Sequence, residues 1–145
     1  MALELLTRTL VGVALESLEV LGGRVSLAQF RLLLRLDELG RVPSSRLAAA
    51  LGLGASSVTR MVDRLQAAGL VVRGGDPNQR AVVTVDLTPE ARQLVATVVQ
   101  HRHELLTRLL NDLTANERAA VVQAAGHLAR TATTDDVATA GLLPL

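Results

Sequence analysis

"SSVTRMVDRLQAAGLVVR", residues 56–73, is the stretch that decides the fold, because the spacing of its apolar residues changes within it. Up to Ala68 the apolar residues recur every three or four positions, as on one face of an α-helix. After Gly69 they follow a period of two, which predicts a β-strand. Glycine can end a helix in the left-handed conformation. The stretch therefore predicts a helix, a tight stop and the first strand of a hairpin.

The second strand of this hairpin is expected in "AVVTVDL", residues 81–87, where three apolar residues alternate with two polar ones. Between the two strands lies "GGDPNQRA", residues 74–81. Gly, Asp, Pro and Asn each favour turns, so this segment is expected to be the loop of the hairpin. The sequence thus predicts two strands joined by a tight turn.

A second short helix is predicted upstream in "SRLAAALG", residues 45–52, where Leu47, Ala48 and Leu51 share one face. Gly52-Leu53-Gly54 joins it to the helix described above. Two short helices joined by a turn that contains glycine are typical of a helix-turn-helix. In the second helix Val58, Met61, Val62 and Leu65 are expected to point inward.

Another helix is expected before this pair. Ser26 and Gln29 have the spacing of a capping box, and Gly40 follows the apolar pattern as a C-terminal stop. From Leu3 to Leu21 helical spacing also occurs, but the apolar stripe extends almost all round. Such a helix is either central to a large core or shared with another chain. In so small a protein we favour a partner subunit.

Two more helices are predicted after the hairpin. Thr88 has the position of an N-cap and Pro89 that of the first helical residue, and the helix should reach about Leu113. A last helix is expected from Asn116 to about Thr131. Residues 133–145 lack periodicity and are interpreted as a tail.

The composition limits the function classes. At 145 residues the chain has the length of one domain. No uncharged apolar run approaches the roughly 18 residues of a membrane-spanning helix, and the N-terminus lacks the charge order of a secretory signal. We therefore expect a cytoplasmic protein without a membrane partner. The sequence has no cysteine, which excludes disulfides, thiolate catalysis and cysteine-based metal sites.

Positive charge is concentrated in the middle of the chain. From Ser44 to Arg80 there are five arginines and two aspartates, a net charge of +3, whereas the whole chain carries +1. The helix pair and the hairpin both lie in this segment. In winged units the second helix enters the major groove and the hairpin reaches the backbone or the minor groove. We therefore expect double-stranded DNA as a partner.

The N-terminal part of the second helix offers suitable side chains on the side left outside the core. Hydroxyls can bond phosphates or bases, and arginine can hold guanine with two parallel hydrogen bonds. The alternative is a solvated helix face without a partner. The residues expected to contact DNA are Ser44, Arg46, Ser56, Ser57, Thr59, Arg60, Arg64, Arg73 and Arg80.

No catalytic, metal or cofactor site is expected. His101 and His103 point to different sides of a helix, whereas helical histidines that chelate a metal usually lie four residues apart. Ser56 and Ser57 lack a His or Lys partner at a recognisable spacing, so nucleophilic catalysis is not indicated. There is no phosphate-binding glycine loop followed by lysine. The protein is therefore not expected to be an enzyme.

Four segments resemble, in order and spacing, the MarR family of bacterial winged-helix transcriptional regulators. They are "SLAQFRLLLRL", "SSRLAAALGLGASSVTRMVDRLQAAGLVVR", "DPNQRAVVTVDLTPEA" and "LTANERAAV". The resemblance implies a mainly α-helical fold with a small β-hairpin, in a single domain of residues 1–145. Within it a winged helix-turn-helix lobe would span residues 26–89, dimerisation helices residues 1–25 and 90–132, and a tail residues 133–145.

The resemblance also implies a function. Such proteins are homodimers whose first, fifth and sixth helices interlock, and they usually repress transcription from pseudo-palindromic sites. Many release DNA when a small-molecule effector binds between the dimer helices and the DNA-binding lobe. That position would bring Arg8, Phe30 and Arg31 near the effector, although core packing is the simpler role for Phe30. One alternative stays open, a protein-interaction module on a winged-helix scaffold with reduced DNA binding.

The hairpin loop departs from the family pattern, which commonly reads Asp-Pro-x-Asp-Arg-Arg. Gln79 stands in place of the second Asp and Ala81 in place of the second Arg. In the family this Arg is typically near the minor groove and can pair with an aspartate of the recognition helix, matched here by Asp63. Three interpretations stay open: Arg80 takes over this role, Arg73 pairs with Asp63, or the hairpin binds DNA more weakly.

Overall fold

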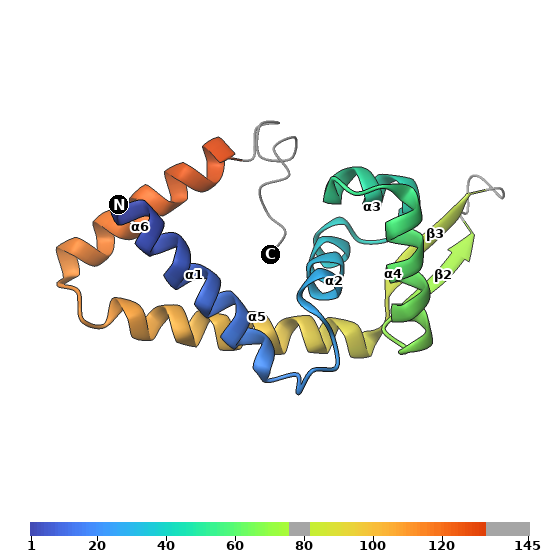
Figure 1. The fold of residues 1–145 in the computed structure, drawn as a ribbon, viewed down its shortest axis with the longest axis horizontal. Coiled ribbons are helices and arrows are strands. Elements are labelled where there is room, and N and C mark those ends of the chain that lie inside the picture. Colours follow the sequence, from blue (N-terminus) through green and yellow to red (C-terminus); the bar gives the residue numbers. More distant parts are fainter. Residues whose placement is uncertain (76–81, 133–145) are drawn as a thin grey trace.

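The computed structural model describes residues 1–75 and 82–132 of the chain. In chain order these residues form α1 (Ala2–Glu19), α2 (Leu27–Leu39), β1 (Val42–Pro43), α3 (Ser44–Leu51), α4 (Ala55–Ala67), β2 (Val71–Gly75), β3 (Val83–Leu87), α5 (Pro89–Leu110) and α6 (Ala115–Ala132). Figure 1 shows α2, α3, α4 and the sheet gathered at one end of the long helix α5, while α1 and α6 lie toward its other end. The mainly helical fold class is confirmed.

The helix starts and stops follow the local signals. The Ser26 hydroxyl accepts from the Gln29 backbone N–H at 3.2 Å, and the Gln29 side chain accepts from the Ser26 N–H at 2.8 Å, which completes the capping box. Gly52 and Gly69 have φ of 63° and 74°, a left-handed conformation that suits glycine and ends α3 and α4. The helix after the hairpin ends at Leu110, three residues before the predicted Leu113.

The sheet has a third strand that the sequence did not predict. The order is β1-β3-β2, both pairs are antiparallel, and β1 aligns Val42 with Val85. Two residues, one of them proline, are too short a run to show alternation. The pairing of β1 is decided by the position of its partner strand, and the two-stranded hairpin is corrected to a three-stranded sheet.

The alternation of β3 ends toward the loop. Val85 and Leu87 are buried as the pattern indicates, but Val83 is 54% exposed and Thr84 only 4%. The Thr84 hydroxyl donates to the Gly74 carbonyl at 3.1 Å, so this buried polar side chain is satisfied. Val83 lies opposite Gly75, which has no side chain to cover it.

One apolar core joins the lobe to α5. Val58, Val62 and Leu65 of α4 are buried in it as predicted, and Met61 packs at its edge. The first half of α5 belongs to the same core. Its buried members there are Ala91, Leu94, Val95 and Val98. Because α5 helps to form the core of the lobe, the lobe cannot turn on α5 without breaking apolar contacts.

The remaining helices leave apolar side chains uncovered. α1 packs on α5 through Val13 and Ser17, but residues 2–10 are all exposed. No described side chain of α6 is buried. The exposed large apolar residues of the two helices are Leu3, Leu5, Leu6, Leu10, Leu15, Val121, Val122 and Leu128. A single chain thus leaves much apolar surface in contact with water, as in proteins that pack against a partner.

Candidate nucleic-acid interface

The helix pair of the lobe is α3 and α4, and its second helix projects one polar side away from the core. Gly54 is the N-cap of α4, and it has no side chain that could accept a hydrogen bond from the first backbone N–H groups of the helix. The core contacts come from one face of the helix. Ser56, Thr59 and Arg60 are exposed near its N-terminus. This end of α4 presents hydroxyl, guanidinium and free backbone N–H groups, which together suit phosphate and base contacts.

Four other residues predicted to contact DNA lie on α3 and α4. Ser44 and Arg46 lie in the first turn of α3, with Ser44 half-buried and Arg46 exposed. Ser57 of α4 is half-buried, whereas Arg64 is exposed one turn further along the helix. Arg80 lies outside the described residues. We use the term wing for β2, β3 and the residues that connect them; Figure 1 shows the two strands beside α4.

Arg73 of β2 connects the wing to α4. Its Nη2 lies 2.7 Å from Oδ1 of Asp63, and its Nη1 donates to Oε1 of Gln66 at 2.9 Å. In the register of the sheet Arg73 is opposite Val85, so its side chain leaves the wing on the face that covers α4. Of the three interpretations left open by the sequence, the structure contains the pairing of Arg73 with Asp63. The guanidinium is thus occupied within the lobe.

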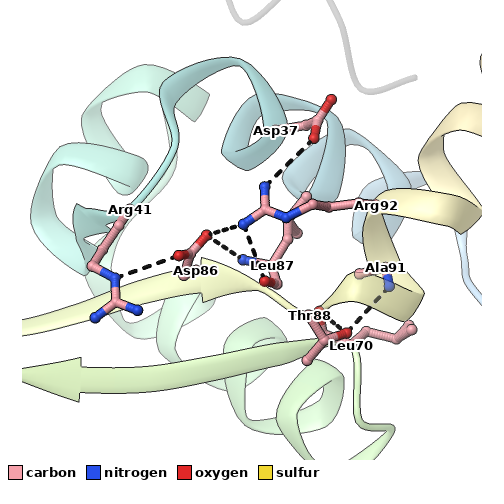
Figure 2. Close-up of polar contacts among 8 residues, drawn as sticks. All are labelled: Asp37, Arg41, Leu70, Asp86, Leu87, Thr88, Ala91 and Arg92. Carbon is pink, nitrogen blue, oxygen red and sulfur yellow. Dashed lines mark hydrogen bonds and ion pairs between the residues drawn. The ribbon is translucent and has the colours of Figure 1, made fainter.

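A second polar cluster holds the opposite face of the wing, and the sequence did not single it out. The Asp86 carboxylate of β3 is in contact with Arg92 of α5 and with Arg41, which precedes β1 (Figure 2). These residues belong to no recognisable motif, since they are 45 and 6 residues apart along the chain. In the sequence, Asp86 is distinguished only as a polar position in the alternating pattern of β3.

The residues predicted near an effector have three different environments. Phe30 is buried in the core, with the guanidinium of Arg102 5.7 Å from its ring centroid, which confirms its packing role. Burial lowers the pKa of Arg102, whose Nε donates to the Ser17 hydroxyl at 3.2 Å. Arg31 donates to the Leu51 carbonyl at 3.2 Å, and Arg8 is exposed on α1. The effector pocket stays a prediction.

Of the two histidines of α5, His101 is half-buried and His103 is exposed. His101 Nδ1 lies 3.7 Å from Oε2 of Glu104, and hydrogen bonding from Gln100 is the main cause that lowers the pKa of this carboxyl. Over residues 1–75 and 82–132, no three His, Cys, Asp or Glu side chains are placed to hold a metal ion. In the same part of the chain, no helix is long and apolar enough to cross a membrane.

A helix-turn-helix followed by an antiparallel wing, with a helix on either side, defines a winged helix-turn-helix protein. Comparison with known proteins gives the family. The family model described as MarR family matches residues 25–82. The HTH-type transcriptional repressor MdtR from Bacillus subtilis (strain 168) is 32% identical over 122 residues, which cover 84% of this chain and 77% of MdtR. The chain therefore belongs to the MarR family of DNA-binding transcriptional regulators.

Solved structures agree with this assignment. The crystal structure of RV1404 from Mycobacterium tuberculosis matches with a TM-score of 0.84 and 31% identity, over 93% of this chain and 91% of that one. A MarR variant from E. coli complexed with operator DNA matches with a TM-score of 0.64 and 25% identity, over 88% and 90%. The chain spans only 66% and 58% of the length of two further curated relatives. The predicted family is confirmed.

Proposed function

We propose that the protein is a homodimeric transcriptional repressor that binds pseudo-palindromic operators through α4 and the wing. The observation that carries this proposal is the polar side of α4: Ser56, Thr59 and Arg60 are exposed at the N-terminal end of a helix whose other side is fixed in the core. The similar MarR structure complexed with operator DNA supports the same kind of ligand.

Each predicted contact has a role that its position suggests. Arg60 is suited to reading a guanine edge, and the neighbouring hydroxyls to phosphate or base contacts. Arg46, at the start of α3, and Arg64 are suited to phosphates. Arg73 already holds Asp63 and Gln66, so we assign it the orientation of the wing against α4 rather than a phosphate contact. The wing contribution to DNA then rests on Arg80.

The second copy would cover the exposed apolar residues of α1 and α6. Both helices lie toward the end of α5 that is away from the lobe (Figure 1), so a partner there leaves α4 and the wing free. A two-fold dimer repeats the recognition helix on successive major grooves, about one DNA turn apart. This symmetry is the reason to expect a pseudo-palindromic operator. By family membership we also propose that a small molecule relieves repression, bound between the dimer helices and the lobe.

The test is a titration of the protein with the DNA immediately upstream of its own gene, followed by fluorescence anisotropy at about 50 and 200 mM salt. A random duplex of equal length serves as the control. We expect tight binding to the upstream DNA, weaker binding to the random duplex, and a steep loss of affinity at the higher salt because counterions are released on binding. No binding at low salt would contradict the proposal and favour the protein-interaction module.

A further inference from the structure

The Asp86 carboxylate is the centre of a polar cluster on the face of the wing that is turned away from α4. Its side chain is only 17% exposed. Oδ1 accepts from the Leu87 N–H and from Arg92 Nη2, both at 2.8 Å, and Oδ2 lies 3.4 Å from Arg41 Nε. Figure 2 shows the two guanidiniums on opposite sides of the carboxylate.

The partners of Asp86 come from elements that are far apart in the sequence. Arg92 is near the start of α5 and also donates to the Leu87 carbonyl at 3.3 Å. Its Nη1 lies 3.9 Å from Oδ1 of Asp37 in the last turn of α2. Two carboxylates and two guanidiniums therefore join α2, β3, α5 and the segment before β1. Hydrogen bonds between charged groups are directional, so they add an angular constraint to the apolar contacts between the lobe and α5.

The cluster extends to the other strand of the wing. The Arg41 guanidinium lies over Gly74 of β2, where an added Cβ atom would be 3.1 Å from its Nη1. Thr84 of β3 donates to the carbonyl of the same glycine. On the other face of the wing Arg73 is bound to α4. The wing is thus attached to the recognition helix on one face and, through Asp86, to α5 on the other.

We propose that Asp86 is a positioning residue for DNA binding, which sets the direction of the wing relative to α5 by accepting hydrogen bonds from Arg41 and Arg92. The proposal rests on the proposed function, since it concerns how the wing meets DNA. α5 leads from the lobe toward the exposed apolar helices (Figure 1). If the angle between the wing and α5 is wrong, each wing of the dimer is therefore misplaced on its half of the operator.

The substitution Asp86→Asn separates positioning from charge. Removing a negative charge next to a DNA-binding surface strengthens binding to any duplex, since phosphates are repelled less. Loss of the wing direction acts in the opposite sense on the operator, where the wing must reach a fixed position, whereas on a random duplex the wing can contact phosphates at any position. We expect Asp86→Asn to bind the upstream DNA about tenfold more weakly, and a random duplex no more weakly than wild type. Asp86→Glu, which keeps the charge, should recover part of the affinity.

Glu38→Gln is the matched control, because it removes the same charge from α2. The Glu38 carboxylate lies 2.6 Å from Arg35 on an exposed face of the same helix. The substitution Glu38→Gln should leave operator binding unchanged or make it slightly stronger. A hydroxyl-radical footprint adds a readout that does not depend on charge: Asp86→Asn should lose protection in the minor grooves that flank the site, where the wing is expected, while protection at the centre remains.

Arg41→Gln guards against a variant that fails to fold, since Arg41 is half exposed and its loss opens no cavity. It should give the same loss of flanking protection, with a thermal unfolding midpoint close to that of wild type. Unchanged flanking protection in either folded variant would overturn the positioning role. If the wild-type protein binds no duplex, the proposed function and this inference both fail. If the wild-type protein binds the upstream DNA and Asp86→Asn or Arg41→Gln binds and protects it in the same way, the inference alone fails.

Discussion

Arg73 forms an ion pair with Asp63, although Ala81 stands at the loop position where the family commonly has an arginine. Its ion pair with Asp63 is partly exposed, at 29% and 55% of the two side chains, so solvent screens it. The hydrogen bond to Gln66 adds a second point of attachment on α4. The pair should therefore matter more for the direction of the wing than for the stability of the fold.

A double-mutant cycle tests this at the residue scale. Arg73→Gln, Asp63→Asn and the double variant are compared by urea denaturation at one protein concentration. Because the pair is partly exposed, we expect a coupling free energy of only about 0.2–1 kcal/mol. Arg92→Gln with Asp63→Asn is a control cycle between residues that share no contact. Strict additivity in the Arg73 cycle would contradict the pairing.

Arg60 carries the prediction about base reading. If its guanidinium holds a guanine edge, Arg60→Ala should weaken binding to the operator by about 1–3 kcal/mol and reduce affinity for a random duplex much less. Arg35→Ala removes the same charge from the exposed side of α2 and is the control. Both are measured by anisotropy at one salt concentration. An equal loss on the two duplexes would assign Arg60 to the phosphates instead.

Arg80→Ala, by contrast, should weaken binding to both duplexes.

At the scale of elements, the start of α5 fixes how the wing passes into the long helix. The Thr88 hydroxyl accepts from the Ala91 N–H at 3.2 Å and donates to the Gly69 carbonyl at 2.9 Å. One side chain thus caps α5 and holds the end of α4 beside it. Figure 2 shows Thr88 at this junction, between Leu70 and the first turn of α5.

Thr88→Ala should therefore destabilise the protein more than an ordinary surface substitution. The expected loss in the free energy of unfolding is about 1–2 kcal/mol, because one cap is removed and one carbonyl loses its donor. Thr97→Ala is the control, since its hydroxyl donates only to the Gln93 carbonyl on an exposed face of the same helix. It should cost less than about 0.5 kcal/mol. Equal costs in urea denaturation would show that the cap contributes nothing.

The elements also show where prediction from sequence stops. Capping residues, glycine stops and apolar spacing act over a few neighbouring positions, and they located α2, α3, α4 and the start of α5 closely. β1 carries no such signal, because two residues become a strand only through pairing with β3. Asp86 was visible only as one polar position in an alternating strand. Its partner Arg41 is 45 residues away in the chain, so only the tertiary structure identifies it.

At the scale of the whole molecule, the exposed apolar residues of α1 and α6 give the last prediction. Leu6→Glu and Val122→Glu place charges on side chains that are 49% and 60% exposed in one chain but should be buried between two. Burying an unpaired carboxylate is costly, so each variant should shift the protein toward monomer. Sedimentation velocity over a range of concentrations measures the shift, and operator affinity should fall at least tenfold.

Val72→Glu provides the control for this experiment. Val72 is also an exposed apolar residue, at 45%, but it lies on β2 in the wing rather than on α1 or α6. Its substitution should leave the sedimentation of the protein unchanged. A wild-type protein that is monomeric at all concentrations, or two dimer-helix variants that sediment as wild type does, would contradict the dimer.

The sequence by itself determined the order of the elements, the positions of most helix ends, the helix-turn-helix and the family, because these follow from spacing and residue type along a short length of chain. It also indicated a partner for α1, since no small core can cover a helix that is apolar on nearly all sides. The tertiary structure alone decided the third strand, the exposure of Val83, the choice of Arg73 as the partner of Asp63, and the attachment of the wing to α5 by Asp86. These features depend on which side chains meet across the fold, and a period of two or of three to four residues carries no information about that.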